Sequence, residues 1–198
     1  MKKLAVLILI AGFAVLLNCE YKTIEQVVAV GIDRSFQGSL DGSDEFETFT
    51  FTLTRAELLD RLDIPDDAEI TDLQIESFAG KFTERDDSQA ESVEMEALVT
   101  TPAGTEVFVE SATYPINTES LEPFSRWMTR RVTELLEAEL LAILQDEGSF
   151  RGINAEIKVR AAERLSLDLY VDLWMNITYE ICQEVPTILG IEGESCEP

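Results

Sequence analysis

The chain has 198 residues, with 39 acidic and 15 basic side chains and no histidine, so its formal net charge is −24. A field of that sign repels phosphate backbones and argues against nucleic acid as a partner. The absence of histidine excludes Ser-His-Asp and Cys-His nucleophile systems. Because the carboxylates are dispersed, a solubility adaptation, as in proteins from saline habitats, explains them more simply than cation binding does.

The N-terminus combines a positive start with a short apolar run. Lys2 and Lys3 precede an uncharged stretch from Leu4 to Leu17. A helix of that length covers roughly 21 Å, which is short of the roughly 30 Å hydrocarbon core of a bilayer. Such a segment is typical of a secretion signal that is removed. The alternatives are an uncleaved membrane helix and an ordinary secretion signal.

The apolar run ends in Leu16-Leu17-Asn18-Cys19, which resembles the lipobox of bacterial lipoproteins. Asn18 stands where that family commonly has Gly, Ala or Ser. The resemblance implies cleavage before Cys19 and acylation of both its sulfur and its new amine, and several acyl chains anchor a protein stably. It predicts a signal peptide over residues 1–18, a lipidated tether over 19–22, and a location in the bacterial cell envelope. The following domain would face the periplasm or the cell exterior.

The cysteine count agrees with this interpretation. If Cys19 carries lipid, Cys182 and Cys196 remain, an even number in an exported protein. We therefore expect a disulfide between them, with two unpaired thiols as the alternative. Without histidine or a close pair of cysteines, the sequence predicts no metal site and no cofactor.

The first half of the mature chain alternates apolar and polar residues, as half-buried strands do. Strands are expected over residues 23–36, 48–53, 70–82, 93–99 and 106–114, with a tight turn at 101–104. Thr54 and Glu57 fit a capping box that opens a short helix over about 55–62.

One long helix is expected over about residues 120–147. Ser120 can cap it, and Gly148 is a fitting stop. Leu140, Leu141 and Leu144 add apolar groups on several faces, which predicts a helix enclosed in the core. Contact of these leucines with a partner or a lipid is the alternative.

The last two strands have the clearest pattern. Residues 153–161 alternate, and residues 165–181 then alternate without interruption. With the earlier strands they predict a mainly β fold: an antiparallel β-sandwich-like single domain over residues 23–198, with one long inserted helix. The alternative is a two-layer α+β fold.

The sequence carries no recognisable catalytic motif, so we expect no enzyme. Acidic loops at residues 41–47 and 63–69 offer calcium ligands, but neither fits an EF-hand, and we do not expect calcium binding.

Tyr170 and Trp174 lie on the polar face of the last strand and form a candidate binding surface. The simpler interpretation is a face covered by the long helix or a loop.

Two functions therefore stand at this point. The first is a noncatalytic envelope lipoprotein that scaffolds or binds a protein partner at the membrane. The second is a carrier that holds an apolar or glycan ligand between sheet and helix. A filled core with an exposed aromatic patch would favour the first, and a closed apolar cavity would favour the second.

Overall fold

The computed structural model describes residues 19–42, 45–65, 67–85, 90–101, 104–146, 152–186 and 191–197, with the side chain of Trp127 left out. The expected signal peptide, the turn residues 102–103 and the expected helix stop at Gly148 lie outside the described residues. Each of the two acidic loops is also described only in part.

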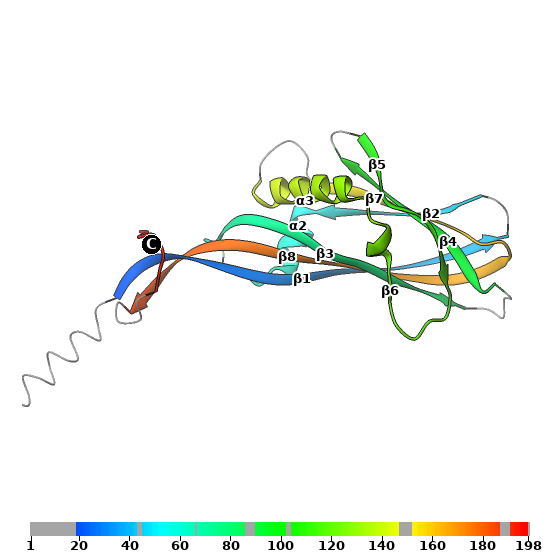
Figure 1. Cartoon of the computed structure of the whole chain (residues 1–198), viewed down its shortest axis with the longest axis horizontal. Coiled ribbons are helices and arrows are strands. Elements are labelled where there is room, and N and C mark those ends of the chain that lie inside the picture. Colours follow the sequence, from blue (N-terminus) through cyan, green and yellow to red (C-terminus); the bar gives the residue numbers. More distant parts are fainter. Residues whose placement is uncertain are drawn as a thin grey trace, which may run out of the picture. The chain divides into compact units, whose positions relative to one another are not determined.

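The fold is mainly β, as the sequence predicts, and consists of two antiparallel sheets with inserted helices. The first sheet has the order β1-β8-β3-β6 and the second the order β2-β7-β4-β5. The strands are β1 (Cys19–Asp41), β2 (Glu47–Thr54), β3 (Glu69–Glu84), β4 (Ser92–Thr101), β5 (Gly104–Pro115), β6 (Glu122–Pro123), β7 (Gly152–Arg160) and β8 (Arg164–Pro186). The helices are α2 (Arg55–Arg61), the 3-10 helix η1 (Phe124–Trp127) and α3 (Arg130–Leu144). Figure 1 shows α3 alongside the sheet that contains β7.

The chain divides into two compact units. Of the described residues, those within 19–27, 64–71 and 178–197 belong to the smaller unit, and those within 28–63 and 72–177 to the larger. The helices α2, η1 and α3 and all strands of the second sheet lie in the larger unit, whereas β1, β3 and β8 of the first sheet each extend into the smaller unit.

Period-two patterning explains the long strand β8. Alternate side chains along it are buried, while the residues between them are mostly half-exposed, because successive side chains of a strand point to opposite faces. The buried set is Leu165, Leu167, Leu169, Val171, Leu173, Met175, Ile177 and Tyr179. The second sheet obeys the same rule, since its register sets buried Phe49 opposite buried Ile157.

The space between the two sheets is filled by side chains. Leu53 of β2, Phe78 of β3 and Val171 of β8 surround a residual apolar cavity, and Leu136 of α3 also lines it. Its volume is only ≈ 30 Å³. Pockets that hold drug-sized ligands have roughly 300–1,000 Å³. Among the described residues, this cavity is therefore far smaller than the carrier function would require.

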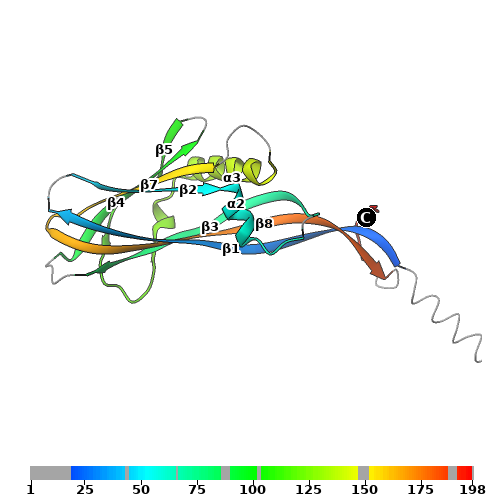
Figure 2. The same cartoon turned by 180° about the vertical axis from the view of Figure 1, so that it is seen from behind.

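The short helix α2 begins as the sequence predicts. The hydroxyl of Thr54 accepts a hydrogen bond from the backbone N–H of Glu57 at 3.3 Å, which satisfies one of the amides left free at a helix start. The second half of the expected capping box is replaced, because the carboxylate of Glu57 pairs with Arg34 of β1. Both views place α2 between β1 and β2, which are edge strands of the two sheets (Figure 1 and Figure 2).

The long helix is shorter than predicted. It begins at Arg130, whereas the sequence pattern predicted a start near Ser120. The preceding segment is tied to β5, because Met128 bridges Val109 and the N–H of Thr129 donates to the carbonyl of Phe108 at 3.1 Å. These pairings hold residues 128–129 in an extended conformation, so local helix propensity is overridden by tertiary contacts.

The leucines at the end of α3 are mostly buried, as the core interpretation predicts. Leu140 and Leu144 are 0% and 2% exposed. Leu141 stays half-exposed.

In the smaller unit, the predicted disulfide between Cys182 and Cys196 is present. The residues next to Cys196 run beside the start of β1, where the N–H of Thr23 donates to the carbonyl of Glu194 at 2.8 Å. Residues 19–22, expected as a tether, are part of β1, and Lys22 also forms a bridge with Ser195.

Candidate functional site

The structure places Tyr170 and Trp174 on the outer face of the first sheet. The simpler interpretation expected the long helix or a loop to cover this face. The side chain of Trp174 is instead 45% exposed among the described residues. Tyr170 is half-buried. Both side chains belong to β8 and point away from the core, because their neighbours Leu169, Val171 and Leu173 fill the inner face.

Trp174 lies directly over Gly31 of the neighbouring strand β1. A Cβ atom at residue 31 would come within 3.1 Å of Cε2 and 3.2 Å of Cζ2 of the indole. Glycine therefore allows the ring to lie close against the backbone of β1. The indole N–H also donates to Oδ2 of Asp172 at 2.6 Å, which fixes the ring's orientation. The result is a positioned aromatic surface rather than a mobile side chain.

Two carboxylates accompany the aromatic pair. Asp172 is 9% exposed, and Asp33 of β1 is exposed. Partial desolvation raises the pKa of the Tyr170 hydroxyl, and the negative charges of Asp172 and Asp33 raise it further. Tyr170 therefore stays neutral at physiological pH and can donate a hydrogen bond.

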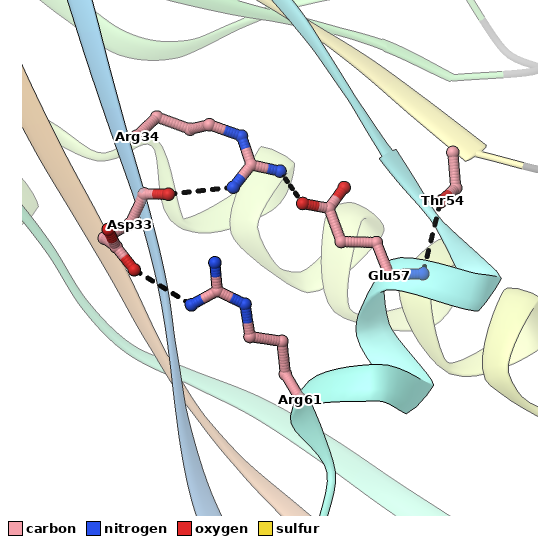
Figure 3. Close-up of polar contacts among 5 residues, drawn as sticks. All are labelled: Asp33, Arg34, Thr54, Glu57 and Arg61. Carbon is pink, nitrogen blue, oxygen red and sulfur yellow. Dashed lines mark hydrogen bonds and ion pairs between the residues drawn. The ribbon is translucent and has the colours of Figure 1, made fainter.

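Asp33 is held by the helix α2, as Figure 3 shows. Arg61 of α2 donates from Nη1 to Oδ1 of Asp33 at 2.9 Å, and this hydrogen bond is the main reason that the pKa of Asp33 is lowered. The neighbouring Arg34 pairs with Glu57 of the same helix, and its guanidinium lies 5.9 Å from the ring centroid of Phe51. These contacts join α2 to β1 and keep Asp33 ionised beside the aromatic pair.

Cys19 is a free, exposed cysteine at the first described residue. Partial desolvation raises the pKa of its thiol, and the negative charge of Glu184 raises it further.

Among the described residues, no group of three or more acidic or cysteine side chains is arranged to hold a metal ion. No helix in the described part of the chain is both long and apolar enough to cross a membrane.

The sequence pattern named two of the residues on this face but missed Gly31, Asp33 and Arg61. Tyr170 and Trp174 are recognisable because they interrupt a polar strand face with large aromatic groups. Nothing in the sequence indicates that β1 lies beside β8. Gly31 and Asp33 therefore could not be predicted to lie next to Tyr170 and Trp174.

The fold and this face define a β-sandwich with an inserted helix and an exposed aromatic surface bordered by carboxylates. No known protein family and no curated protein matches the chain.

The solved structures that it resembles are distant. A crystal structure of the decameric BFDV capsid protein matches 77% of this chain and 99% of its own, with a TM-score of 0.40 and 10% identity. The structure of infectious bursal disease virus, Gx strain, matches 90% of this chain and 46% of its own, with a TM-score of 0.34 and 12% identity. Likeness of this degree does not bear on function.

Proposed function

We propose that the chain is a lipid-anchored protein of a bacterial cell envelope, whose sandwich binds a protein partner without catalysing a reaction. The observation that carries the proposal is that two of the three cysteines form a disulfide while the third is free. Cys182 and Cys196 are joined, and Cys19, which ends the lipobox-like segment, is free and exposed. A disulfide favours an oxidising, extracytoplasmic compartment, which agrees with export.

Two further observations favour partner binding over a ligand carrier. The cavity between the sheets has ≈ 30 Å³, which leaves no room for an apolar or glycan ligand. By contrast, Trp174 presents an oriented and exposed indole, and tryptophan is enriched among the residues that dominate the energetics of protein interfaces. The carrier function is therefore the weaker candidate.

The anchor is tested by replacing Cys19 with alanine in a bacterium that is fed a labelled fatty acid. We expect the label on the protein to be lost, because the acylated sulfur is gone. The double variant Cys182→Ala/Cys196→Ala is the matched control and should keep its label. If Cys19→Ala still carries fatty acid, the proposed anchor is wrong.

The binding surface is tested by crosslinking the lipidated protein in its native membrane and purifying it. We expect a partner that copurifies with the unchanged protein to be reduced at least about tenfold by Trp174→Ser, since truncating a dominant interface residue costs about 2 kcal/mol or more. Leu121→Ser is the control, because Leu121 is also an exposed apolar side chain, at 39%. Equal recovery with both variants would contradict a role for Trp174.

A further inference from the structure

The strand β3 has an edge that no other described strand covers between residues 72 and 78. On one side β3 neighbours β8, and on the other β6 pairs with it only at Ala79 and Gly80. The edge strand β5 of the second sheet differs, because Met128 and Thr129 lie against it. An uncovered edge offers backbone groups to which another extended chain can pair.

A side chain occupies this edge in place of a strand. The N–H of Ile75 donates to Oε1 of Glu137, a residue of α3, at 2.7 Å. The amide is therefore satisfied by a carboxylate at the end of a rotatable side chain. A carbonyl group from an added strand could accept the same hydrogen bond, and Glu137 would then be free to pair with a cation.

A groove of ≈ 470 Å³ lies between β3 and α3, next to this edge. The exposed or half-exposed apolar side chains that line it are Ile75, Ala138 and Leu141. Leu73 also lines the groove but is only 3% exposed. The charged groups that line the groove are all carboxylates, from Asp72, Glu76, Glu134 and Glu137. Arg130 lies outside this lining and pairs with Glu134 in an exposed contact.

We propose that this groove binds an extended, basic segment of a partner protein, which adds a strand to the free edge of β3. Side chains of an extended segment alternate between two faces. One set would lie on Ile75, Ala138 and Leu141, and the other, lysine or arginine, would pair with the carboxylates. The free edge provides backbone hydrogen bonds, and the one-sign lining provides selectivity for positive charge.

The proposal goes beyond the anchoring at Cys19 and does not depend on it. It is tested with the full-length chain in nonionic detergent and a short, capped, fluorescent peptide in which lysine alternates with valine. Binding is followed by fluorescence anisotropy. Glu134→Gln/Glu137→Gln should raise the Kd roughly tenfold, because hydrogen bonds to a charged group are about twice as strong as neutral ones. Glutamine at 137 can still accept from Ile75, so the fold is retained.

Two controls separate groove binding from general attraction to an acidic protein. Glu96→Gln/Glu110→Gln removes the same charge from a second hollow, which Glu96, Glu106 and Glu110 line together with Arg131, and should leave the Kd unchanged. A peptide with the same charges but methylated on alternate backbone amides cannot complete a strand ladder and should bind much more weakly. Equal effects of the two double variants, equal binding of the methylated peptide, or no binding of the first peptide would each overturn the proposal.

Discussion

Replacing Phe124 with alanine is expected to lower the free energy of unfolding by about 3–5 kcal/mol, the range for emptying a buried phenylalanine site. Phe124 is 0% exposed, and its ring centroid lies 4.7 Å from that of Tyr114 and 5.3 Å from that of Phe78. The same ring presses on Gly80, where an added Cβ would lie 2.4 Å from Cε2 of Phe124. Such tight packing leaves little room for the surroundings to collapse into the space left by the ring.

Denaturant unfolding followed by circular dichroism measures this loss. Phe36→Ala is the control, because Phe36 also stacks on two phenylalanines, with centroids 5.4 Å and 5.8 Å away, but is only half-buried. Its truncation should cost clearly less. If both variants lose the same stability, the aromatic cluster around η1 does not have the importance that its burial implies.

Removing the disulfide with Cys182→Ser/Cys196→Ser is expected to release the C-terminal segment from β1. The bridge closes a loop with a sequence separation of 14. In the chain-entropy model, a disulfide that closes a loop of that length stabilises the folded state by about 3 kcal/mol. Besides the disulfide, the described residues of the segment are held by backbone hydrogen bonds such as that from the N–H of Cys196 to the carbonyl of Tyr21 at 3.3 Å.

Amide hydrogen exchange detects this release locally. The amide of Thr23, which donates to Glu194, should exchange much faster in the double variant, whereas the amides in the middle of β7 should not change. Cys19→Ser is the control, since it leaves the bridge intact. Unchanged protection at Thr23 after loss of the bridge would show that the strand pairing holds the segment by itself.

Period-two patterns predicted the β-sandwich because the alternation of apolar and polar residues within each strand shows which of its faces is buried. In β8 the alternation from Leu165 to Tyr179 fixes which face is inside, whatever its neighbours are. The start of α3 was not predictable in the same way. Residues 120–129 suit one continuous helix locally, but Glu122 and Pro123 pair with β3, residues 124–127 form only the short η1, and Met128 and Thr129 pair with β5.

The candidate site was predictable only in part, for the same physical reason. Trp174 stands out within its own strand, whereas the need for a glycine at residue 31 depends on a neighbouring strand distant in the sequence. The groove beside β3 depends on Glu137 reaching Ile75, a contact across 62 positions. Features of this kind arise from topology and carry no local pattern.

The central claim is that Cys19 becomes the lipid-bearing first residue of the mature protein. Mass spectrometry of the protein purified from bacterial membranes tests it directly. We predict an N-terminal peptide that begins at Cys19, with a mass increased by a diacylglyceryl group and an amide-linked acyl chain or by the diacylglyceryl group alone. An N-terminal peptide that retains residues 1–18, or one that contains an unmodified Cys19, would contradict it.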